Sequence, residues 1–427
     1  MNGLRHWLYI SVMIFVALTF APRFTSVGDV SLSVVLTIVW LFASAANALS
    51  WGSTGLPVAS RDSRLYAIFL FCCFALSVFS LASALYAEDP FRTMRTSYFQ
   101  MLGAITTLVI ASSCRDWRRL EKIIAVVAIA GLVSAAFSIM SLHVPGMEGL
   151  IFRETGRTSG LFKHPNQLGM ALSSVAPLVV GWSFARWGVG ASLTCAAILF
   201  VASVYSGSKT NLVLTMIAVA PVFLVMTRAI ANRYLRTLSI FGTIGLIAIA
   251  APIAAEFVAM ISPRAYRILY GLTIGDTSEA GSLMTRLTLW NESIDLGLSN
   301  PLLGVGAGQP IGVWPHSHNV FMDYFRTLGV PGLLMVAIQI AAACSFSVKA
   351  SMLAISGNQL TVALRVYLFA SASSVVIFII SNQSSESFGP NTVPLLWIYL
   401  GILLALLRVT RDRVQSARKV AAAQDTA

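Results

Sequence analysis

The sequence predicts an all-α polytopic membrane protein, and its composition, its hydropathy and the length of its apolar runs predict this class. Of 427 residues, 57% are hydrophobic and 11% are charged, whereas soluble domains carry about 25% charged residues. The mean hydropathy is +0.78. Apolar runs long enough to cross about 30 Å of hydrocarbon recur along the chain. Because lipid offers no hydrogen-bond partner to the backbone, these runs are expected to be helices.

We predict about twelve transmembrane helices in a single membrane domain, residues 1–409, without an internal repeat. The expected spans are residues 7–22, 30–49, 65–87, 97–113, 120–141, 166–185, 189–207, 210–227, 238–257, 320–348, 362–381 and 393–409. The segment 410–427 is basic and then Ala-rich, and we expect a cytoplasmic disordered tail there.

The distribution of charge predicts the orientation. With twelve spans, the side that holds both termini carries 18 basic and five acidic residues, a balance of +13, against 11 basic and 12 acidic residues, or −1, on the other side. The positive-inside rule therefore places both termini in the cytoplasm. The basic pI of about 9.8 follows from this topology, so no nucleic-acid partner is needed to explain it.

The longest predicted extramembrane segment is the loop 258–318, far longer than the usual connection of about 4–6 residues. It contains one helical pattern that begins near Ser282 as N-cap and ends at Asn300-Pro301. Glycines then alternate at 304, 306 and 308, where the backbone could approach another surface closely. The apolar positions of the helical pattern are Leu283, Leu287, Trp290, Ile294 and Leu298.

Several cations fall on the outer side of the predicted topology. Arg157 is either an interfacial anchor or a clamp for an anion, and Arg92 and Arg95 are expected to snorkel at the interface. The turn 206–211 contains Lys209 and is either an anion site or an ordinary capped turn. Asn166 is expected to cap the helix that follows Pro165.

Histidines and carboxylates leave further alternatives open. His316 and His318 form an H-x-H pair that, with Asp323, would be an incomplete metal site. Asp323 and Arg326 are spaced for a local ion pair. A pair of carboxylates for glycoside chemistry could come from the outer loops, and the candidates are Glu154, Glu292, Asp295 and Glu386.

Four motifs in succession resemble the O-antigen ligase and Wzy-type polysaccharide polymerase superfamily, and within it ExoQ-type exopolysaccharide polymerases. They are Arg157-Thr158-Ser159-Gly160 to Pro165-Asn166, Ser206-Gly207-Ser208-Lys209-Thr210, Arg286 to Trp290 with Pro301 to Gly306, and His318-Asn319 to Asp323 with Leu328-Gly329. Lys209 stands where many relatives carry Arg, and lysine lacks the bidentate fork of arginine.

This resemblance implies a bacterial inner-membrane glycosyltransferase with a GT-C-like fold and a periplasmic active site. It implies an undecaprenyl-diphosphate-linked donor, a glycan acceptor and no metal ion or other cofactor, with a flippase and chain-length regulators as partners. By motif, Arg157, Arg286 and Lys209 would bind the diphosphate and His318 would be the base. The expected supporting residues are Lys163, Asn166, His316, Asn319 and Glu386.

Two other functions stay open from the residues alone. A ligase would transfer the glycan to lipid A core instead of to another lipid-linked repeat unit, and no residue in the sequence reports on the acceptor. A transporter of polysaccharide or lipid-linked sugar is the second, since about twelve spans are also typical of carriers. Carriers place substrate groups near the bilayer midplane, often in repeated halves, and this chain has its polar clusters in outer loops.

Overall fold

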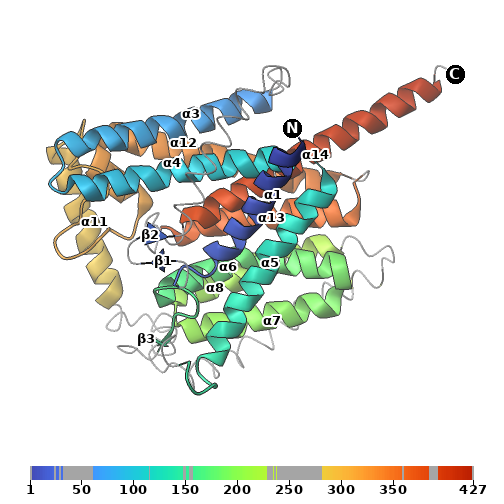
Figure 1. Ribbon diagram of the computed structural model, residues 1–427, viewed down its shortest axis with the longest axis horizontal. Coiled ribbons are helices and arrows are strands. Elements are labelled where there is room, and N and C mark those ends of the chain that lie inside the picture. Colours follow the sequence, from blue (N-terminus) through green and yellow to red (C-terminus); the bar gives the residue numbers. More distant parts are fainter. Residues whose placement is uncertain are drawn as a thin grey trace.

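The computed structural model describes residues 2–23, 26–27, 30–31, 61–114, 116–147, 151–152, 157–227, 234, 237, 281–357, 360–383 and 393–425. Helices dominate this part of the chain (Figure 1). Two short antiparallel ladders accompany them, β1 (Ser26–Val27) with β2 (Val30–Ser31) and β3 (Ile151–Phe152) with β4 (Arg157–Thr158).

Within the described residues, eight helices are long and apolar enough to cross a membrane, which confirms a polytopic membrane protein. Seven of these helices are α5 (Trp117–Met140), α6 (Pro165–Trp187), α7 (Val189–Ser206), α8 (Lys209–Thr227), α12 (Val320–Ser356), α13 (Val362–Ser381) and α14 (Val393–Asp425). The eighth, Arg64–Leu85, is α3 (Arg61–Ala82) with the 3₁₀ turn η1 (Ser83–Leu85).

The other four predicted spans divide into two kinds. Residues 30–49 and 238–257 lie outside the described residues. Residues 7–22 and 97–113 are largely covered by α1 (Asn2–Thr19) and α4 (Pro90–Ser113), which are not among the eight. The apolar part of α1 is short, and α4 carries polar side chains along much of its length.

The predicted disordered tail is instead helical, because α14 continues to Asp425. Its C-terminal end projects beyond the other helices (Figure 1). Alanine, arginine, lysine and glutamine dominate this segment and are strong helix formers, so local propensity extends the helix once α14 has begun.

Helix α6 lies at the centre of the bundle. It packs against α5, α7, α8 and α13, and 89% of its central window is buried, more than in any other of the eight spans. A helix that is apolar on all sides belongs in such a position. Helices α3, α4 and α12 run side by side next to this group, and α11 (Gly281–Ser299) packs against α12 (Figure 1).

Helix α12 is broken at Gly329, whose φ of 65° and ψ of −161° are not helical. The break and Pro331 leave the carbonyl groups of Arg326 and Thr327 without their intrahelical donors. The loop after α11 replaces these donors. Val305 N donates to Arg326 O at 3.0 Å and Gly306 N to Thr327 O at 2.9 Å, while Val330 N donates to Pro301 O at 2.7 Å.

The alternating glycines let this loop lie against two helices, as the sequence predicted. A Cβ atom on Gly304 would lie 2.3 Å from the backbone of Thr327, and one on Gly308 would lie 2.1 Å from Thr96 Oγ1. Both glycines also have positive φ, 66° and 70°, which side chains disfavour. The loop after α11 is therefore fixed between α12 and α4.

Helix α11 ends at Ser299, as predicted, but it begins at Gly281, so Ser282 lies inside the helix and is not its N-cap. The predicted apolar face is also wrong. Leu287 and Leu298 are exposed, whereas Leu289 and Ser293 are buried. Gly297 explains the difference, since a Cβ there would lie 2.6 Å from Phe325. Close approach to α12 selects the face with small side chains.

Candidate functional site

The turn His316-Ser317-His318, the histidine turn below, immediately precedes α12 and is held from two sides. Trp290 Nε1 on α11 donates to Ser317 O at 3.0 Å. Ser317 N donates to Asp323 Oδ1 on α12 at 2.8 Å. Asn319 caps α12 by accepting from the backbone N–H groups of Phe321 and Met322. Asn319 therefore stabilises the first turn of α12, directly after the histidine turn.

The two histidine rings lie against each other, with centroids 4.5 Å apart at an angle of 73°. His318 has a φ of 60°, and among the described residues it is the one non-glycine with positive φ. Such backbone strain costs about 1–3 kcal/mol and clusters at functional sites. Burial, followed by the neighbouring His318, lowers the pKa of His316 to about 4. His316 is therefore neutral at physiological pH, and its Nε2 is buried without a hydrogen-bond partner in the described structure.

Asp323 and Arg326 form the predicted ion pair, with Arg326 Nη2 3.3 Å from Asp323 Oδ1. Only 1% of the Arg326 side chain and 10% of that of Asp323 are exposed. The guanidinium also donates to the carbonyl groups of Pro310 and Gln309, at 3.0 and 2.8 Å. A buried pair persists when further hydrogen bonds satisfy its polar atoms, and here they tie α12 to the loop before the histidine turn.

Arg157 occupies a second cluster, at β4. Its Nε donates to Ser206 O and its Nη2 to Asn166 Oδ1, both at 2.7 Å. The side chain also packs on Gly207, where a Cβ would lie 2.8 Å from Arg157 Nε. Two motifs that resemble the polymerase superfamily therefore meet here, one around Arg157 and one in the turn after α7. In the structure, the side chain of Arg157 joins these two motifs.

The predicted cap of α6 is wrong, and the residue that replaces it links the two clusters. His164, not Asn166, is the N-cap, with Nδ1 accepting from Asn166 N at 3.1 Å. Asn166 instead accepts from Arg157. Burial lowers the pKa of His164, and the charges of Arg157 and His318 lower it further. His164 is thus within electrostatic range of both the Arg157 cluster and the histidine turn.

Arg286 lies on α11 one turn before Trp290, and residues at i and i+4 share a helix face. Since Trp290 reaches the carbonyl of Ser317, Arg286 is on the side of α11 that faces the histidine turn. Its guanidinium is half-buried, and burial lowers its pKa. A partly desolvated arginine interacts more strongly with an anion than an exposed one does.

The remaining predicted residues are dispersed. Lys163 is exposed. Lys209 is the first residue of α8, but its side chain, like Glu386 and Glu154, lies outside the described residues. Glu292 and Asp295 are both exposed on α11. In the described part of the chain, no three histidine, cysteine or acidic side chains gather in a way that could hold a metal ion.

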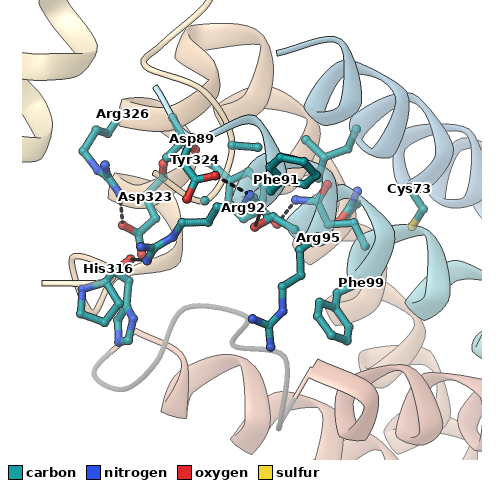
Figure 2. A pocket seen from close by; sticks show the side chains of 18 of the residues that line it. Cys73, Asp89, Phe91, Arg92, Arg95, Phe99, His316, Asp323, Tyr324 and Arg326 are labelled. Atoms are coloured by element: carbon teal, nitrogen blue, oxygen red, sulfur yellow. Dashed lines mark hydrogen bonds and ion pairs between the residues drawn. The ribbon is translucent and has the colours of Figure 1, made fainter. Parts of the chain in front are cut away.

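A cavity of about 520 Å³ lies beside the histidine turn, and two of its cations were not predicted to lie at a site. Arg92 and Arg95, expected at the membrane interface, line it together with His316, Asp323 and Arg326 (Figure 2). A helical spacing could have indicated this, because Arg92, Arg95 and Phe99, like Arg92, Thr96 and Gln100, repeat at intervals of three to four residues on α4. The other lining residues are Cys73, Leu76, Asp89, Phe91, Ala307, Gly308, Pro315, Tyr324, Thr327, Gln339 and Trp397.

Residues 171–337 match the Wzy_C family model, described as O-Antigen ligase. The matched stretch runs from α6 into α12, past the break at Gly329, and includes Arg286 and the histidine turn. A comparison with curated proteins finds no match. Members of the Wzy_C family are membrane glycosyltransferases of the ligase or polymerase type, which supports an enzyme and not a transporter. The central part of this polytopic membrane protein is accordingly similar to the Wzy_C O-antigen ligase domain family over residues 171–337.

Proposed function

We propose that the protein polymerises oligosaccharide repeat units linked to undecaprenyl diphosphate, as ExoQ-type enzymes of exopolysaccharide synthesis do. The observation that carries the proposal is the convergence of distant motifs. His318 lies against His316 and within electrostatic range of His164, and His164 is in turn close to Arg157. Transfer from a lipid diphosphate needs a base for the acceptor hydroxyl and cations for the leaving diphosphate.

In the proposed step, the acceptor hydroxyl oxygen attacks the anomeric carbon and its proton passes to His318. The bond from that carbon to the phosphate oxygen breaks, and the lipid diphosphate departs with the electron pair. Arg157 and Arg286 stabilise the departing diphosphate, with Lys209 as a weaker third cation. Attack opposite the leaving group inverts the anomeric carbon. The proposed supporting groups are Lys163, Asn166, His316, Asn319 and Glu386.

Two fixed guanidinium groups would supply the charge that a divalent cation supplies in other glycosyl transfers. We therefore propose a reaction that needs no metal ion. By the positive-inside rule, with a balance of +13 on the side of both termini, the site would lie at the periplasmic face of the inner membrane. A flippase and chain-length regulators would be its partners there.

The test is a reconstituted assay with purified protein, lipid-diphosphate-linked repeat units as the sole glycan, and EDTA. We expect a ladder of lipid-linked products that differ by one repeat unit. Single repeat units unchanged after long incubation, in protein shown to be folded, would refute polymerisation. Loss of the ladder in EDTA with recovery on added Mg²⁺ or Mn²⁺ would refute the metal-independent step.

Ligation to lipid A core is the second candidate, because the matched family model is described as O-Antigen ligase. The chemistry at the donor would be the same and only the acceptor would differ. Deletion of the gene separates the two. Single repeat units that remain on the lipid indicate a polymerase, and long chains that remain unattached to lipid A core indicate a ligase.

A further inference from the structure

The cavity beside the histidine turn holds two cations that the proposed glycosyl transfer does not use. Arg92 and Arg95 both lie on α4 and line the cavity, Arg92 reaching toward His316 and Arg95 pointing toward Phe99 (Figure 2). Arg92 Nη2 donates to Pro315 O at 3.3 Å, so it reaches the residue before the histidine turn. Arg95 lies over the Phe99 ring, 5.9 Å from its centroid, and Figure 2 shows it pointing away from Asp323.

The acidic residues of the cavity are engaged elsewhere. Asp323 forms its ion pair with Arg326 and accepts from Ser317 N. Asp89 caps α4 by accepting from the backbone N–H of Arg92 at 3.0 Å. Within the described residues, neither Arg92 nor Arg95 forms an ion pair with a carboxylate. Two guanidinium groups three residues apart on one helix therefore leave an excess of positive charge on the α4 side of the cavity.

The end of the cavity next to His316 contains buried polar atoms without partners in the described structure. Asp323 Oδ2, Arg326 Nε and His316 Nε2 have no hydrogen-bond partner in the described structure, and Asp323 and Arg326 are more than nine-tenths buried. Buried polar groups are normally satisfied, by protein, water or ligand. A donor such as Arg326 Nε suits an anionic oxygen, and Asp323 Oδ2 suits a hydroxyl group of a sugar.

The other end of the cavity is apolar and lies among the membrane spans. Its lining there includes Cys73 and Leu76 of α3 and Trp397 of α14. From Asp89 to Gln100, α4 lines the cavity over about 16 Å at 1.5 Å per residue. A cavity with cations at one end and apolar side chains in the membrane at the other suits an anion attached to a hydrocarbon chain.

We propose that Arg92 and Arg95 form a second anion site, which binds the diphosphate of the lipid-linked acceptor. This inference rests on the proposed polymerase function, in which the donor and the acceptor both carry a lipid diphosphate. Arg157 and Arg286 hold the donor's diphosphate on one side of the histidine turn. Arg92 and Arg95 hold the acceptor's on the other, so that the acceptor glycan reaches His318 from the cavity.

The test counts bound ligands by native mass spectrometry of the full-length protein in detergent, with farnesyl diphosphate as the probe and farnesol as the uncharged control. We expect two farnesyl diphosphate molecules on the wild type, one on the Arg92→Gln/Arg95→Gln double variant and one on Arg286→Gln. Arg64→Gln, an exposed arginine on α3, should still bind two. Thermal unfolding of each variant establishes that it is folded.

Four outcomes overturn the inference in distinguishable ways. Two molecules on the double variant, or equal displacement of the second molecule by phosphatidylglycerol, would show that Arg92 and Arg95 do not select a diphosphate. One molecule on the wild type, lost in Arg286→Gln but kept in the double variant, would remove the second site and leave the proposed function intact. Binding of none by the wild type would refute both.

Discussion

Trp290 on α11 and Ser317 in the histidine turn are joined by one hydrogen bond of 3.0 Å, from the indole Nε1 to the carbonyl oxygen. The side chain of Asp323 on α12 accepts from the N–H of the same Ser317. The backbone N–H and C=O groups of Ser317 are therefore held by side chains from two different helices. The position of His318 is thus set jointly by α11 and α12.

Trp290→Phe should lower activity more than stability. The ring is retained but the Ser317 carbonyl loses its donor, which costs about 1 kcal/mol in folding, while a small displacement of a catalytic group can cost about 10²-fold in rate. The measurements are thermal unfolding and the rate of ladder formation. Leu298→Ala, at a position on α11 that is 63% exposed, is the control. Equal rates for Trp290→Phe and the control would contradict this role.

His318→Ala should reduce turnover by about 10² to 10⁴, the usual cost of losing a general base. Alanine keeps the Cβ atom that makes the φ of 60° at this position costly, so the backbone strain should be about unchanged and the variant should remain folded. His318→Gln, which keeps the polarity without the proton-accepting imidazole, should be equally slow. Turnover within threefold of the wild type in either variant would remove His318 from the mechanism.

Acid should destabilise the wild type through His316. Its pKa in the folded state is about 4, below the unfolded value of about 6.5, so the unfolded chain binds a proton first as the pH falls. The stabilisation is present above about pH 6.5 and is lost between there and about pH 4. His316→Asn should show a shallower fall in unfolding temperature over this range. Parallel pH profiles for the two proteins would contradict the burial of a neutral His316.

Asp323→Asn should destabilise the protein by about 3–5 kcal/mol, because it leaves the buried Arg326 without its counter-ion. The loss should appear as a lower unfolding temperature in detergent. Asp295→Asn, which removes an exposed carboxylate of α11, should change stability by no more than about 0.5 kcal/mol. A similar effect of both substitutions would mean that the ion pair does not support the loop.

Gly304→Ala should prevent the loop after α11 from docking on α12, since the added Cβ would lie 2.3 Å from backbone atoms of Thr327. Gly312→Ala is the matched control. Gly312 also has a positive φ, 54°, but nothing lies within 4 Å of its Cβ position, so only the strain of about 1 kcal/mol should appear. The yield of monodisperse protein measures the difference, and equal yields would contradict the docking.

Patterns that depend on a local period could be predicted from the sequence. Eight spans, the end of α11 and the ion pair of Asp323 with Arg326 follow from apolar runs, Asn-Pro and an i, i+3 spacing. Features that depend on a tertiary partner could not. The buried face of α11 is decided by Phe325 against Gly297. Arg92 reaches Pro315, next to the histidine turn, only because the loop after α11 folds back onto α4.

The break at Gly329 divides α12 into two segments that are attached to different parts of the molecule. Residues 320–328 are bonded through the carbonyls of Arg326 and Thr327 to residues 305 and 306, and Gly329 interrupts their connection to the remainder of the helix. The first segment is therefore hydrogen-bonded to the loop after α11, whereas the rest of α12 packs in the helix bundle. We expect a displacement of this loop to be transmitted directly to Asp323 and the histidine turn and to be decoupled from the rest of α12 at a single glycine.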